Sequence, residues 1–89
     1  MGKQLGEKRR LGVVAIMVGD RNSAYFHVNQ ILHEFGEIVV GRLGVPYRER
    51  NISIMALLVD GNTDEIGALT GKLGQIKSVN VKSAFIKIQ

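Results

Sequence analysis

The sequence has no cysteine, no tryptophan, a single proline and no long apolar run. Without cysteine the chain cannot form disulfides, thiolate metal sites or a cysteine nucleophile. Its apolar runs have the length of a strand and are far too short to span a membrane. The first ten residues are polar and basic and do not resemble a signal peptide, so we expect a soluble cytoplasmic protein with no membrane partner.

The net charge of +4 is unevenly distributed. Residues 1–10 hold four basic side chains and one acidic one, whereas the remainder holds eight basic and seven acidic side chains. We therefore expect residues 1–10 to form a basic, flexible tail and residues 11–89 to form one domain. A basic tail on a nearly neutral domain is weak support for nucleic-acid binding, and the composition disfavours such a partner.

Extended and helical patterns alternate along the chain. Six segments after the tail predict, in order, a strand, a helix, two strands, a helix and a last strand. They are LGVVAIMVG, DRNSAYFHVNQILHEFG, EIVVGRLGVPY, NISIMALLVDG, NTDEIGALTGKLG and VNVKSAFIKI. Asn62 with Glu65 predicts a capping box at the second helix, and Gly36 suits a left-handed residue after the first. The order βαββαβ predicts an α+β, ferredoxin-like two-layer sandwich, with two helices on one face of a four-stranded antiparallel sheet.

The two central strands of such a sheet, which begin at Leu11 and Ile52, are apolar on both faces. A sheet with one wet face should instead carry polar residues at every second position. Because no further segment is left to cover the second face, we predict a homo-oligomer that uses this open face.

Other positions suggest contact surfaces. Phe26 and His33 point away from the apolar stripe of the first helix and are candidates for an interface. Gly67 and Gly71 lie four residues apart on the second helix, which predicts close backbone approach to the neighbouring helix or to another subunit.

The stretch GRLGVPYRERN carries three arginines, one tyrosine and the only proline. Pro46 fits an edge strand, where its missing N–H faces solvent. Arg42, Tyr47, Arg48 and Arg50 are therefore candidates for an assembly or partner surface, rather than for a small-molecule site.

No motif predicts catalysis, a metal or a cofactor. GALTGK is too short for a phosphate-binding loop, and His27 and His33 face different directions on one helix. The fold also occurs in RNA-binding domains, acylphosphatases and copper chaperones, but this chain lacks their strand aromatics, anion cradle and CxxC, respectively. The first turn of the first helix, at Ser23, carries no acid and leaves N–H groups that water or an anionic ligand could satisfy.

The run VVAIMVGDRNSAYFHVNQILHEFGEIVV resembles the strand–helix–strand of ACT domains, regulatory modules that bind amino acids at subunit interfaces. This resemblance marks Asp20, Arg21, Asn22 and Ser23 as candidate ligand-binding residues. Ser23 replaces the glycine whose backbone approaches the ligand in that family, which argues against amino-acid binding here.

The blocks GRLGVPYRE and VDGNTDEIGALTGKLG resemble small ACT-like proteins described as iron-only hydrogenase system regulators, and the similarity spans nearly everything after Arg10. The resemblance implies a non-catalytic regulatory module that acts as an oligomer through sensing of a small metabolite or through binding of a protein partner. Two alternatives remain: a structural interaction module without a ligand, and a nucleic-acid binder that acts through the basic tail.

Overall fold

The computed structural model describes residues 9–19 and 22–86 of the chain. Its elements follow the order expected from the sequence, with one additional short 3₁₀ turn in the hairpin between the second and third strands. They are β1 (Arg9–Val18), α1 (Asn22–Glu34), β2 (Val39–Tyr47), η1 (Arg48–Arg50), β3 (Ile52–Asn62), α2 (Thr63–Gly74) and β4 (Val79–Ile86).

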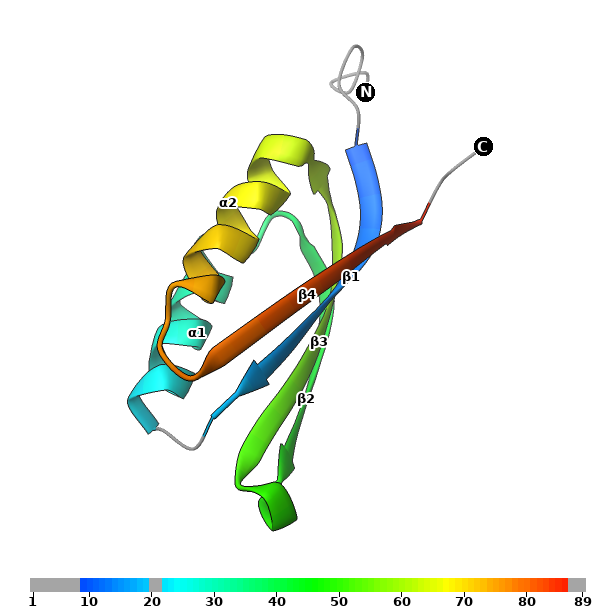
Figure 1. Cartoon of the computed structure of the whole chain (residues 1–89). Helices are drawn as coiled ribbons and strands as arrows, with labels where there is room; N and C mark the ends of the chain where they lie inside the picture. Colours follow the sequence, from blue (N-terminus) through cyan, green and yellow to red (C-terminus); the bar gives the residue numbers. More distant parts are fainter. Residues whose placement is uncertain (1–8, 20–21, 87–89) are drawn as a thin grey trace.

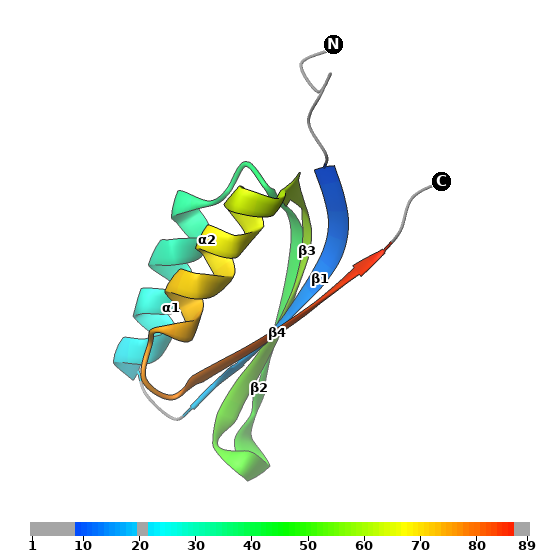
Figure 2. The same cartoon turned by 45° about the horizontal axis from the view of Figure 1, so that its top comes forward.

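The four strands form one antiparallel sheet in the order β2-β3-β1-β4. Both helices lie side by side against one face of the sheet, and none of the described elements covers the opposite face (Figures 1 and 2). This arrangement confirms the ferredoxin-like sandwich and the central positions of β1 and β3.

The core lies between the helices and the sheet. Every second residue of the central strands points into it, because successive strand side chains face opposite sides. The buried apolar residues are Val14, Ile16, Val18, Ala24, Val28, Leu32, Ile38, Met55, Leu57, Val59, Ile66, Leu69, Leu73 and Val79. No polar or charged side chain is buried among the described residues.

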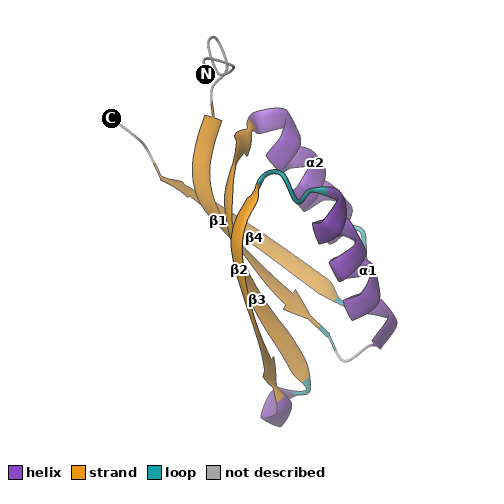
Figure 3. Ribbon diagram, turned by 180° about the vertical axis from the view of Figure 1, so that it is seen from behind, coloured by secondary structure: helices purple, strands orange, loops and turns teal. Residues whose placement is uncertain are grey.

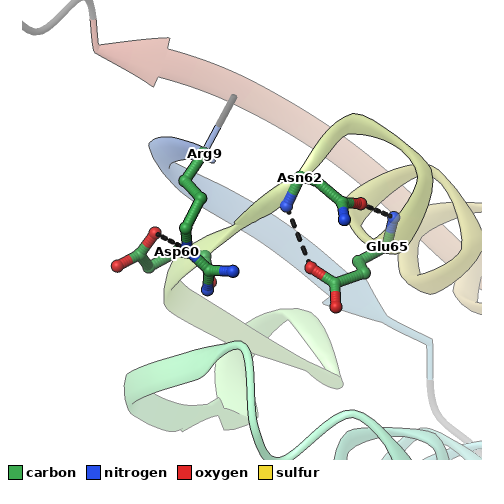
Figure 4. Close-up of polar contacts among 4 residues, drawn as sticks. All are labelled: Arg9, Asp60, Asn62 and Glu65. Atoms are coloured by element: carbon green, nitrogen blue, oxygen red, sulfur yellow. Dashed lines mark hydrogen bonds and ion pairs between the residues drawn. The ribbon is translucent and has the colours of Figure 1, made fainter. Parts of the chain in front are cut away.

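Local polar contacts fix the start of α2. The Asn62 side chain accepts a hydrogen bond from the Glu65 backbone N–H at 2.7 Å, and the Asn62 N–H donates to Glu65 Oε1 at 2.9 Å (Figure 4). This reciprocal pair is the predicted capping box. The expectation for Gly36 is wrong, because its backbone is not left-handed; its N–H donates to the His33 carbonyl in a tight turn instead.

Strand β1 begins at Arg9, inside the segment that we expected to precede the domain. Arg9 Nε donates to Asp60 Oδ1 at 3.2 Å, and another guanidinium nitrogen donates to the Asp60 carbonyl at 2.7 Å (Figure 4). These bonds join the start of β1 to the end of β3. Residues 1–8 of the expected tail lie outside the described residues.

Candidate functional site

The face of the sheet opposite the helices, on which no described helix lies (Figure 3), carries mainly apolar side chains according to the strand registers. Leu58 at its centre is 53% exposed, and Leu43 on the neighbouring strand is 65% exposed. The pairing register places one set of apolar side chains on this face, and we call that set the open-face patch: Leu11, Val13, Ala15, Met17, Leu43, Val45, Tyr47, Ile52, Ile54, Ala56, Leu58, Ala84 and Ile86.

Polar side chains border the patch rather than interrupt it. Asp60 stands opposite Leu11 near one end, where it is held by Arg9. On β4, Asn80 and Lys82 share the face with the patch. An apolar centre with a polar rim is the anatomy of a protein interface.

A second feature is a groove of about 890 Å³ between α1 and the C-terminal end of α2. Its lining combines short polar side chains with charged ones of both signs. The lining residues are Ser23, Ala24, His27, Gln30, Ile31, Glu34, Lys72, Gln75, Ile76, Lys77 and Ser78.

Two contacts shape this groove. Lys72 Nζ and Glu34 Oε1 lie 3.3 Å apart and bridge the helices. At the end nearest the sheet, the Gly19 N–H donates to the Ser78 carbonyl at 2.6 Å, and Ser78 has a left-handed backbone with φ of 75°. The turn from α2 into β4 is thereby held against the end of β1, close to the start of α1.

Of the four candidate ligand-binding residues, the structure describes only Ser23 completely. Asp20 and Arg21 lie outside the described residues, and Asn22 begins α1 with a side chain that is likewise not described. Ser23 is exposed and lines the groove. Sequence reasoning missed the second half of the groove, residues 75–78, because no local pattern brings that turn to α1.

The candidate interface residues do not form one surface. Phe26 is 59% exposed, and both Phe26 and His33 lie on the outer side of α1. Arg42 lies on the helix side of β2, where its guanidinium donates to Asn29 Oδ1 on α1 at 2.7 Å. Tyr47 belongs instead to the open-face patch.

Arg48 and Arg50 are exposed in η1, at the tip of the hairpin between β2 and β3. The turn closes at Asn51, which has a left-handed backbone and donates its N–H to the Arg48 carbonyl at 3.1 Å. They follow Tyr47 directly in the chain, so they adjoin the end of the open-face patch at Tyr47 and Ile52 but belong to the turn rather than to the sheet.

The expectation of close backbone approach at Gly67 and Gly71 within the chain is wrong. A Cβ atom added at either position would meet nothing within 4 Å among the described residues. Both glycines are exposed and line a shallow hollow of about 460 Å³ between α2 and β4. The alternative, approach by another subunit, stays a prediction.

Within residues 9–19 and 22–86, no cluster of three or more His, Cys, Asp or Glu side chains has the geometry to hold a metal ion. Among the helices in the same ranges, none has both the length and the apolar character needed to cross a membrane.

Solved structures define the class of the fold. The ACT domain from GTP pyrophosphokinase of Chlorobium tepidum superposes with a TM-score of 0.72 at 19% identity, covering 86% of this chain and 100% of that domain. The C-terminal domain of the MgtC protein from Mycobacterium tuberculosis gives a TM-score of 0.64 at 17% identity, covering 85% of this chain and 86% of that one. At these identities the likeness shows the fold alone, which is ACT-like.

Sequence similarity then gives the family. Residues 10–83 match the family model described as "TM1266-like: Iron-only hydrogenase system regulator, putative". The uncharacterized protein TM1266 from Thermotoga maritima is 45% identical, with a TM-score of 0.87 over 90% of this chain and 100% of that one. The chain belongs to this family, which confirms the resemblance seen in the sequence. No protein of curated function matches the chain.

Proposed function

We propose that this chain is a non-catalytic regulatory module of an iron-only hydrogenase system and that it acts as a homo-oligomer built on the open-face patch. The family description supports the regulatory role.

The open-face patch is the observation that carries the proposal. Strands of eight to eleven residues rise about 3.3 Å per residue and lie about 4.8 Å apart, so the face measures roughly 30 Å by 19 Å in projection. That is about 570 Å², and the corrugation of side chains makes the accessible area larger. A stable dimer buries about 800 Å² per partner, so the patch has the size that a second copy requires.

The test is the molar mass of the purified full chain by light scattering. We expect an oligomer, and Leu58→Glu should reduce its mass because the substitution places a charge at the centre of the patch. The matched control is Phe26→Glu, a charge at a similarly exposed apolar residue on the outer side of α1, and it should leave the mass unchanged.

A monomeric wild-type chain would overturn the oligomer proposal. If Phe26→Glu lowered the mass and Leu58→Glu did not, the subunits would associate through α1 and the open-face patch would not be the interface.

The groove favours a second candidate function, sensing of a small ligand. Its volume lies in the range typical of ligand pockets, and hydrogen-bonding side chains from α1 and from the α2–β4 turn converge on it. The first turn of α1, at the rim of the groove, carries no acidic residue, and the positive end of a helix favours an anionic group.

A thermal-shift scan against amino acids, nucleotides, hydrogenase-related metabolites and divalent metals tests this role. A ligand present at 100 times its dissociation constant adds about 2.7 kcal/mol of stability. We expect any stabilising compound to lose its effect with Ser23→Leu, which fills the groove, and to keep it with Thr63→Leu at the first turn of α2.

A scan without any stabilising compound would favour the alternative of a structural interaction module without a ligand. The further alternative, nucleic-acid binding through the tail, falls largely on residues 1–8, which lie outside the described residues. It predicts binding that weakens steeply with salt and is lost when residues 1–10 are removed.

A further inference from the structure

The outer edge of β4 presents hydrogen-bonding groups that no described residue uses. The bond from the Gly19 N–H to the Ser78 carbonyl fixes the alternation along the β1–β4 ladder, because paired residues alternate between bonded and non-bonded positions. Even-numbered residues of β4 therefore direct their backbone groups toward β1. Val81, Ser83 and Phe85 direct theirs outward.

The other edge of the sheet is different. The bond from the Asp60 N–H to the Ile38 carbonyl sets the alternation between β3 and β2, so Arg42, Gly44 and Pro46 have the outward positions on β2. Pro46 has no N–H there, and a register shift interrupts the strand between residues 39 and 41. Proline, bulges and lysine side chains are devices that protect an edge from pairing. In its described length β4 has neither proline nor a bulge, and its one lysine, Lys82, points to the open face.

We propose that β4 pairs with β4 of a second copy of this chain, antiparallel and around a two-fold axis at Ser83. Two identical sheets would then join into one continuous sheet of eight strands. This interface uses the edge of the sheet rather than its open face, and it does not depend on the assembly proposed above.

Charge selects the position of the axis. Paired residues must face the same side of the sheet, so the axis passes through one residue of β4. An axis at Lys82 would set two lysines opposite each other, which is unfavourable. An axis at Ser83 instead pairs Lys82 with Ala84 of the other copy and Val81 with Phe85, and it engages every residue from 80 to 86. An axis at Val81 or Ala84 pairs a shorter stretch.

The position of α2 fits the same axis. The axes of the two outer strands lie about 14 Å apart, and two helices packed about 10 Å apart and centred over them would put the axis of α2 roughly 2 Å inside β4. Two β4 strands about 4.8 Å apart would then bring the two α2 axes to about 9 Å, within the range of packed helices.

The glycine-lined hollow lies where those two helices would meet. Gly74, at the end of α2, and Val79, at the start of β4, line the same hollow, and seven residues of helix, about 10 Å, lead back from Gly74 to Gly67. The strand from Val79 to Ser83 covers about 13 Å, so Gly67 lies near the level of the proposed axis. Small residues at this point leave room for the second helix.

Single cysteines test both the interface and its register, because the chain contains no other cysteine. At an axis through Ser83, the two Cα atoms of residue 83 lie about 5.5 Å apart, within the range of a disulfide. The two Cα atoms of residue 82 lie about 8 Å apart, which is beyond that range. We expect Ser83→Cys to form a covalent dimer under mild oxidation, and Lys82→Cys not to.

Substitutions at the edge test whether the pairing holds the assembly together. Ser83→Pro removes an outward N–H without breaking the ladder to β1, and Gly44→Pro makes the same change on the opposite edge. We expect Ser83→Pro to halve the molar mass measured by light scattering and Gly44→Pro to leave it unchanged. Gly67→Leu should also halve the mass, since it fills the space of the second helix.

The outcomes separate this interface from the open-face assembly. Ser83→Cys should still cross-link in a Leu58→Glu background. If both interfaces exist, the wild-type chain should be a tetramer, and either Leu58→Glu or Ser83→Pro should reduce it to a dimer. Absence of the Ser83→Cys dimer would overturn the edge interface. Cross-linking of Lys82→Cys as fast as, or faster than, Ser83→Cys would overturn the proposed axis.

Discussion

Alanine at Gly67 and Gly71 should stabilise the fold, because the structure leaves space for a methyl group at both positions. Glycine inside a helix costs about 1 kcal/mol relative to alanine. The double substitution should therefore raise the free energy of unfolding by about 2 kcal/mol. For a domain of this size each 1 kcal/mol shifts Tm by about 4–8 °C, so Tm should rise by roughly 8–16 °C.

The matched control is Gly12→Ala, the same chemical change with the opposite expected sign. A Cβ atom at Gly12 would lie 2.7 Å from the Ala84 carbonyl oxygen and 2.7 Å from Phe85 Cδ1. The Phe85 ring can rotate away, but the carbonyl belongs to the backbone of β4, which is paired with β1. Overpacking of this kind typically costs about 1–3 kcal/mol, so Tm should fall.

Scanning calorimetry and guanidinium denaturation measure both effects. The variants should be compared in a Ser83→Pro background, so that pairing along β4 does not contribute to the measured stability. If the double alanine variant were no more stable than its parent, or if Gly12→Ala were neutral, the argument from free space around each glycine would be refuted.

Asn62→Ala removes the acceptor for the Glu65 N–H and should lower the free energy of unfolding by about 1 kcal/mol, measured by denaturant titration; an unchanged midpoint would show that the capping box contributes nothing. Leu57→Ala empties a fully buried position and should cost about 2–5 kcal/mol, a loss that chemical denaturation would detect as a much lower midpoint. Arg42→Ala breaks an exposed contact with Asn29 and should cost less than about 1 kcal/mol. It should also leave the molar mass unchanged, because Arg42 lies on the helix side of the sheet; a smaller mass would contradict the open-face assembly.

The sequence by itself determined the elements and their order. Alternation along the strands, helical spacing in the two helices and the Asn62–Glu65 pair are local signals, because each depends on residues a few positions apart. The same alternation showed that β1 and β3 are apolar on both sides, which is why the open face could be predicted before the fold was known.

The candidate site depended on contacts between distant segments, and there the sequence was less informative. Arg42 and Tyr47 lie in one strand and were grouped as one surface, but the pairing with β3 puts them on opposite sides of the sheet. The sequence alone does not distinguish Gly12 from Gly67. In the structure, a Cβ atom at Gly12 would clash with Ala84 and Phe85 of β4, whereas a Cβ atom at Gly67 would meet no described atom within 4 Å.

The groove and the free edge were likewise decided by the tertiary structure. Ser23 meets the turn at residues 75–78 because the crossover through α2 returns the chain to β1 on the side opposite β3. The outward direction of the backbone groups at Ser83 follows from the β1–β4 register. Both are properties of long-range pairing, which a local pattern cannot encode because it does not specify which strands become neighbours or in which register.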